Sequence, residues 1–232
     1  MKYIAHREEE REQLLLDHLT GTAEKAKKFA EVFGKGDWGY CCGMLHDLGK
    51  YSDKFQRRIR GEEIKVDHAT AGARVCLELG GMYPFMEYCI AGHHAGLPDA
   101  GGKSDAGNSP TLNGRRKKKI EDFQAYKKEV CIPELKTVPI DINKTTNAEF
   151  SLGMFTRMLY SCLVDADFLD TEEFMADMVQ FYKDFGVGKL GLHKAFRIDH
   201  DENGRAVIVP VTRIAHVRLD DLVGYEIPKQ KL

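Results

Sequence analysis

The stretch "CCGMLHDLGKYSDKF", residues 41–55, decides the fold, because an apolar run ends here on an imidazole, a carboxylate and an ammonium group. His46 and Asp47 are adjacent, and Gly49 and Lys50 follow them. A single His-Asp dipeptide does not define a site. Its meaning depends on which other side chains the rest of the chain brings to it.

Helical periodicity extends to about residue 185, which predicts a mainly α fold. In the first helix Leu15, Leu19, Thr22, Ala26, Phe29 and Phe33 recur three and four residues apart, and Gly34 ends the pattern. The third helix is expected to begin at an Asp67 N-cap and to stop at Gly80-Gly81. We expect helices over residues 12–34, 38–48, 67–79, 84–94 and 150–174, with Gly49 permitting the turn out of the second.

The character of the sequence changes after residue 185. Apolar and polar residues alternate around Asn203-Gly204, a turn signal that predicts a short β-hairpin followed by a further strand. We therefore expect a helical domain at residues 1–185 and a small β-rich segment of unknown role at 186–232.

Composition limits the classes of function. A chain of 232 residues suits one sizeable domain with a small appendage, and a net charge of −2 is too even to indicate a nucleic-acid or membrane partner by itself. No apolar run approaches the roughly eighteen residues of a membrane span, and the N-terminus is too polar for a signal peptide. We expect a soluble, cytoplasmic protein whose six cysteines are reduced core thiols.

Side chains that can bind metals occur at five places beside apolar helix faces. A lone histidine or aspartate of this kind is usually a hydrogen-bonded core residue or a cap. Burying the whole set would cost several kcal/mol for each group, a cost that bound divalent cations would offset. The set comprises His18, His46-Asp47, His68, His93-His94, and either Asp165 or Asp167.

The order H…HD…H…HH…D, with Lys50 three residues after Asp47, resembles the HD superfamily of metal-dependent phosphohydrolases. The segments "MLHDLGKYSDKFQ", "DHATAGA", "GHHAGLP" and "LVDADFLDTE" resemble the HD nuclease domain of the CRISPR-associated helicase-nuclease of type I systems. The resemblance covers residues 4 to about 180. It implies a five-helix metal-binding core and a nuclease that cleaves single-stranded DNA in antiviral defence.

The resemblance also implies which residues hold the metals. Asp47 would bridge two ions, and the family pattern favours Asp167 over Asp165 as the last ligand. The first ion would be held by His18, His46, Asp47 and Asp167, and the second by Asp47, His68, His93 and His94.

An imidazole-rich shell favours manganese, nickel, cobalt, iron or zinc over magnesium. Two such ions lower the pKa of water and clamp a phosphate for in-line attack. Lys50 would place a positive charge on that phosphate, although a solvated lysine at a helix end is an alternative interpretation.

The basic run Arg115, Arg116, Lys117, Lys118 and Lys119 follows a Gly-rich loop at 95–114 and precedes aromatic residues. This combination is typical of nucleic-acid binding, and a solvated charged helix face is an equal alternative. The resemblance implies single-stranded DNA and a CRISPR surveillance complex as partners. The family's nuclease domain is commonly followed by a helicase portion, but the sequence contains no G-x-x-x-x-G-K-[ST] ATP site. A nuclease subunit that works with a separate helicase subunit, a truncation, and a variant with a different C-terminal adaptor are the alternatives. The alternatives in function are an HD phosphohydrolase for nucleotides or cyclic nucleotides, and a binding module whose HD site is silent.

Overall fold

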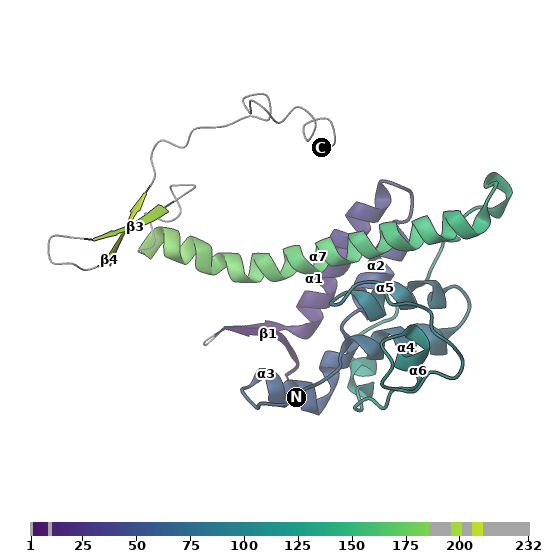
Figure 1. Cartoon of the computed structure of the whole chain (residues 1–232), viewed down its shortest axis with the longest axis horizontal. Coiled ribbons are helices and arrows are strands. Elements are labelled where there is room, and N and C mark those ends of the chain that lie inside the picture. Colours follow the sequence, from purple (N-terminus) through teal and green to yellow (C-terminus); the bar gives the residue numbers. More distant parts are fainter. Residues whose placement is uncertain (1, 9–10, 186–195, 201–205, 211–232) are drawn as a thin grey trace, which may run out of the picture. The chain divides into compact units, whose positions relative to one another are not determined.

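The computed structural model is mainly helical, as predicted (Figure 1). It describes residues 2–8, 11–185, 196–200 and 206–210. The chain divides into two compact units, residues 1–174 and residues 175–232. The predicted domain boundary at residue 185 stays a prediction, because most of the segment that follows it lies outside the described residues.

The expected helices are present with adjusted bounds. The helices that correspond to the five predicted ones are α1 (Leu15–Glu31), α2 (Gly36–Leu45), α4 (Ala69–Leu79), α5 (Glu87–Gly92) and α7 (Ala148–Phe185). Other elements join them: η1 (Leu48–Tyr51), α3 (Asp53–Ile59), η2 (Tyr83–Met86), α6 (Leu112–Lys117), η3 (Gln124–Lys128) and η4 (Ile142–Lys144). The second predicted helix was too long, since α2 ends at Leu45 and a separate 3₁₀ turn carries Leu48.

The buried face of α1 agrees with the predicted stripe except at Phe29. Leu19, Thr22 and Ala26 are fully buried. Phe29 is 36% exposed, whereas Ala30 beside it is buried. After Ala26, the next buried position is therefore Ala30, four residues later, rather than Phe29, three residues later. A helical period of 3.6 residues allows either spacing.

Two glycines let helices approach closely enough to bring the functional side chains together. A Cβ at Gly43 of α2 would clash with the backbone of Ala23 in α1. Gly49, predicted to permit an exit turn, lies in η1 against the backbone of His68, where a Cβ would also clash. The reason for Gly49 is therefore close backbone packing between η1 and the start of α4.

A two-stranded sheet at the N-terminus was not predicted. Strand β1 (Ile4–Glu8) pairs antiparallel with β2 (Arg11–Leu14), so the first helix begins at Leu15 rather than at residue 12. The buried side chain of Gln56 in α3 accepts a hydrogen bond from the Ile4 backbone nitrogen at 3.1 Å and donates one to the Ile4 carbonyl at 2.9 Å. A side chain thus completes the outer edge of β1, which no sequence periodicity reveals.

In the second unit, β3 (Phe196–His200) pairs antiparallel with β4 (Ala206–Pro210), and Ile198 lies opposite Ile208. The two strands predicted on either side of Asn203-Gly204 are therefore present. The turn itself and the further strand expected after it lie outside the described residues.

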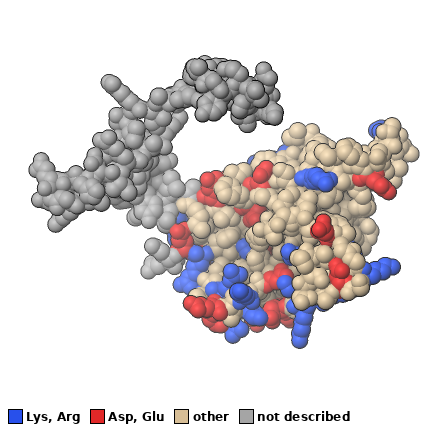
Figure 2. All heavy atoms as spheres, in the orientation of Figure 1, with Lys and Arg blue, Asp and Glu red and all other residues tan. Residues whose placement is uncertain are grey.

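The prediction that the cysteines are core thiols is confirmed for five of the six. All six are free, but Cys131 is exposed and is not a core residue. Positive and negative side chains lie side by side on the described surface, as Figure 2 shows. Within the described part of the chain, no helix has the length and apolar character needed to cross a membrane.

Candidate metal centre

The ends of separate helices deliver the predicted ligands to one place. His18 lies in α1, and His46 and Asp47 follow the last residue of α2. His68 immediately precedes α4, and His93 immediately follows α5. At a helix end, some backbone groups have no hydrogen-bond partner within the helix. They can therefore orient nearby ligand side chains toward another helix.

Asp47 lies at the middle of this cluster. Its Oδ2 atom is 3.5 Å from Nε2 of His18 and 3.4 Å from Nε2 of His46. Its Oδ1 atom is 3.5 Å from Nε2 of His68 and 3.4 Å from Nε2 of His93. Each carboxylate oxygen therefore faces a different pair of imidazoles, which is the arrangement that a bridging carboxylate requires.

Asp167 joins the cluster and Asp165 does not. Oδ1 of Asp167 lies 3.3 Å from Nε2 of His18 and 3.6 Å from Nε2 of His46. Asp165 is exposed. Positions two apart on a helix point in different directions, so α7 can present only one of the two aspartates to the cluster.

The ligand atoms form sets that could hold metal ions. Atoms within 4.8 Å of one another comprise one set from Asp47, His68, His93 and His94, one from His18, His46 and Asp47, and one from His46, His93 and Asp167. The first set matches the ligands expected for the second ion. The individual ligand roles stay predictions, because the number and identity of the ions are not determined by these positions.

Several buried atoms of the cluster make no hydrogen bond to a described residue, although Oδ2 of Asp47 forms an ion pair with Lys50. Nε2 of His18, His46 and His93 and both oxygens of Asp47 are buried without a hydrogen bond to any described residue. Such groups cost about 1–3 kcal/mol each when left unpaired. A divalent cation would satisfy these atoms together, and a donor set of imidazole nitrogens and carboxylate oxygens suits a transition metal.

Hydrogen bonds on the opposite side of each ring orient these nitrogens. Nδ1 of His46 donates to the Gly43 carbonyl and Nδ1 of His93 to the Ile90 carbonyl, both at 2.7 Å. In the neutral imidazole this leaves the Nε2 lone pair directed into the cluster. The backbone thus prepares both rings as ligands.

Burial and charge act differently on the two sides of the cluster. Burial lowers the pKa of His46, but the charges of Asp47 and Asp167 outweigh it and raise that pKa to about 10. Burial lowers the pKa of His68 to about 4. Without metal, His46 therefore holds a proton that a bound cation must displace. Metal binding is expected to weaken as the pH falls.

Lys50 belongs to the cluster and is not a solvated helix-end lysine. It is 4% exposed, and its Nζ lies 2.7 Å from Oδ2 of Asp47. Its positive charge therefore lies beside the carboxylate at the centre of the site. Its predicted contact with a substrate phosphate stays a prediction.

Two residues near the cluster were missed from the sequence. Asp170 is buried, and its Oδ2 lies 2.8 Å from Nδ1 of His18, which orients that ring as carbonyls orient His46 and His93. Asp170 follows Asp167 by three residues, so helical spacing was a usable signal. His6 in β1 lies with its Nε2 3.4 Å from Nζ of Lys50, and only the unpredicted strand places it there.

One side of the cluster faces solvent. His18, His46 and Asp47 are fully buried, whereas His94 is exposed. A cavity of about 410 Å³ lies on this side, and we call it the entry cavity. It is lined by thirteen residues that include His68, His94, Arg115 and Lys118.

The basic run is largely engaged in contacts within the protein. Arg116 donates two hydrogen bonds to the buried Glu87 carboxylate, at 2.8 and 2.5 Å. Nζ of Lys118 lies 2.6 Å from Oδ2 of Asp67. Lys117 donates to two backbone carbonyls of the preceding loop, and Arg115 contacts the Thr70 hydroxyl at 3.5 Å. Nucleic-acid binding by this run stays a prediction.

The fold and the cluster define a class: a helical protein with a histidine-aspartate centre suited to metal-dependent hydrolysis. The HD domain family model matches residues 15–135, which is more than half of the chain. The chain therefore belongs to the HD domain family. This membership indicates a metal-dependent hydrolase, and the matched segment contains every predicted ligand except the aspartate of α7. No curated protein matches the chain.

Proposed function

We propose that this protein is a two-metal phosphodiesterase that hydrolyses single-stranded DNA in type I CRISPR interference. The observation that carries the proposal is the set of buried nitrogen and oxygen atoms around Asp47 that make no hydrogen bond to a described residue. The entry cavity beside this set is lined in part by Arg115 and Lys118. The substrate class and the CRISPR setting rest on the resemblance of the motifs to type I nuclease domains.

The chain's own residues would hold the ions and position the substrate. His18, His46 and Asp167 would bind one ion, and His68, His93 and His94 the other, with Asp47 between them. Divalent ions, when bound, polarise a phosphate and lower the pKa of an attacking water. Lys50 would offset the charge that develops on the phosphate, since its ammonium group lies beside Asp47 in a site where water is scarce.

Access to the ions favours a flexible strand. The buried side of the cluster admits no substrate, so a phosphate must reach it past His68 and His94. Arg115 and Lys118 line this approach and can attract a polyanion. A single strand can bend into such a cavity, whereas a duplex is held stiff by its base pairs.

Hydrolysis of nucleotides or cyclic nucleotides is the second candidate. A volume of about 410 Å³ lies within the roughly 300–1,000 Å³ typical of small-molecule pockets. The same metals would then act on a small ligand held inside the entry cavity.

An assay on both substrate classes tests the proposal. Protein loaded in turn with manganese, nickel or cobalt is incubated with single-stranded DNA, with duplex DNA, and with a panel of mononucleotides and cyclic nucleotides. We expect the single strand to be degraded and the nucleotides to survive. Turnover of nucleotides with intact DNA would replace the proposal with the second candidate. Both classes surviving under all three metals would support a silent binding module.

A further inference from the structure

A second cavity continues from the entry cavity and extends past the basic run to Lys54 and Lys65. It has a volume of about 390 Å³ and shares Val66, Asp67 and Lys118 with the entry cavity. We call it the lysine groove. It is lined by Lys54, Lys65, Val66, Asp67, Lys118, Lys119, Ile120 and Glu121.

The lysine groove carries an excess of positive charge. Four of its lining residues are lysines and two are carboxylates. Lys118 pairs with Asp67 at 2.6 Å, and Lys54 pairs with Glu121 at 2.9 Å. Lys65 and Lys119 are exposed, and neither has a carboxylate partner among the described residues. Two lysines are thus available to an external anion.

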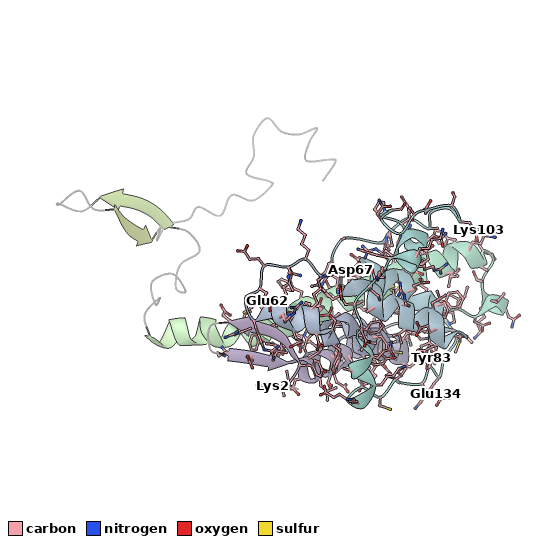
Figure 3. The ribbon with its side chains drawn as sticks, turned by 90° about the horizontal axis from the view of Figure 1, so that it is seen from below. Lys2, Glu62, Asp67, Tyr83, Lys103 and Glu134 are labelled. Atoms are coloured by element: carbon pink, nitrogen blue, oxygen red, sulfur yellow. The ribbon has the colours of Figure 1, made fainter. Side chains whose placement is uncertain are left out.

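The groove lies a short distance along the chain from the metal centre. Lys65 precedes His68 by three residues, which an extended backbone spans in at most roughly 11 Å. Asp67, between them, lies on the segment that leads into α4 (Figure 3). A polyanion with negative groups spaced over this distance can therefore contact the metal centre and Lys65 at once.

We propose that the lysine groove binds the phosphates that flank the scissile phosphate of a single-stranded nucleic acid. This inference rests on the proposed function and adds the path of the strand. Lys65 and Lys119 hold the neighbouring phosphates, while the entry cavity presents the scissile phosphate to the metal centre. A mononucleotide has no flanking phosphodiester and gains nothing from the groove.

Binding measured against oligonucleotide length tests the groove without relying on turnover. Full-length Lys65→Glu/Lys119→Glu protein and wild type are titrated, with a chelator present, into fluorescent deoxythymidine oligonucleotides of about 4 and about 16 nucleotides, the range of single-strand site sizes. We expect the wild type to bind the longer strand more tightly. The variant should lose at least about tenfold in affinity for the longer strand, and its salt slope should decrease by about 1.4, since each lost phosphate contact removes about 0.7.

A matched control separates the groove from overall charge. Lys28→Glu/Lys144→Glu makes the same change of charge at two exposed lysines that line neither cavity, and it should bind like wild type. Equal weakening in both variants, or an affinity of the groove variant within twofold of wild type, would overturn the inference. DNA binding that depends on the groove, combined with nucleotides as the only substrates cleaved, would refute the proposed function and keep the groove. DNA cleavage, combined with DNA binding that does not depend on the groove, would keep the proposed function and refute the role of the groove.

Discussion

The metal centre and the basic run are both dense in charged side chains, yet they differ in what satisfies those charges. Around Asp47, buried imidazole nitrogens and both carboxylate oxygens lack hydrogen-bond partners among the described residues. In the basic run, Arg116 and Lys118 are paired with Glu87 and Asp67. Charge density therefore does not identify a functional site. What distinguishes the metal centre is that several buried imidazole nitrogens and carboxylate oxygens without hydrogen bonds converge on one place. Single atoms of this kind, such as Nε of Arg115, also occur elsewhere in the described residues.

The largest effect is expected from removing Asp47, which would break the metal centre itself. Asp47→Ala deletes the carboxylate whose two oxygens face two different pairs of histidines, so the loss of metal affinity should exceed the roughly 100-fold that removal of an outer-shell partner costs. Metal at about 100 times its dissociation constant should stabilise the wild type by about 2.7 kcal/mol and the variant by nothing. Thermal unfolding with and without manganese measures this. Equal stabilisation of both proteins would show that Asp47 is not a ligand.

The two aspartates of α7 provide an internal comparison. Asp167→Ala should lower metal content and activity because its carboxylate faces His18 and His46. Asp165→Ala removes an exposed carboxylate and should leave both properties unchanged. Metal analysis of the two purified variants decides between them, and a larger loss in the Asp165 variant would contradict the assignment.

Asp170 contacts the predicted ligand His18 and tests the effect of a residue that orients a ligand. Asp170→Asn weakens the acceptor that orients Nδ1 of His18, so metal affinity should decrease by about 10–100-fold while the fold persists. Glu173→Gln is the matched control, since Glu173 shares the Lys25 partner but is exposed and does not contact His18. Metal titrations measure the affinities. A similar loss in both variants would trace the effect to Lys25.

The basic run should respond in stability rather than in metal content. Arg116→Ala leaves the Glu87 carboxylate, which is 1% exposed, without its two guanidinium bonds and should lower the free energy of unfolding by about 1–2 kcal/mol. Lys119→Ala, at an exposed position, should change stability by less than about 0.5 kcal/mol. Urea unfolding compares the two. An Arg116 variant with unchanged stability and reduced metal content would show that Arg116 supports the metal centre rather than the fold.

The smallest effect concerns Asp37, a carboxylate that the protein satisfies fully. Burial raises the pKa of Asp37, but hydrogen bonds from the Thr137 hydroxyl and from the Thr137 and Lys136 backbone lower it below 3.8 overall. Its stabilising contribution is therefore present above about pH 4 and is lost as the pH falls through the folded-state pKa. Asp37→Asn should cost about 1 kcal/mol at neutral pH and nothing at the acid end. A difference that persists at low pH would contradict this origin.

Much of the centre was predictable because its ligands lie at helix ends that carry sequence signals. Asp67 does accept a hydrogen bond from Thr70 near the start of α4, and Gly80 and Gly81 both adopt positive φ at its end. The predicted N-cap was Asp67, with His68 in the first turn, whereas in the structure His68 is the N-cap and α4 begins at Ala69. These signals therefore located His68 at this helix end to within one residue. The positions of His46-Asp47 and His93-His94 directly after apolar runs likewise predicted that these residues lie at helix ends.

Other features could not be predicted, because they depend on contacts between distant segments. Only Gln56, some fifty residues away, completes the edge of β1 and so places His6 near Lys50. The pairing of Arg116 with Glu87 joins two helices whose sequences give no indication of each other. Side-chain type and spacing report local structure, whereas the satisfaction of a charge is a property of the assembled fold.

The most direct test of the central claim is the metal content of the full-length protein after equilibrium dialysis against manganese, nickel or zinc. The account predicts two ions per wild-type chain and a large loss in Asp47→Ala. A wild type that binds no ion, or an Asp47→Ala variant with unchanged metal content, would show that the unpaired nitrogens and oxygens around Asp47 do not form a metal centre.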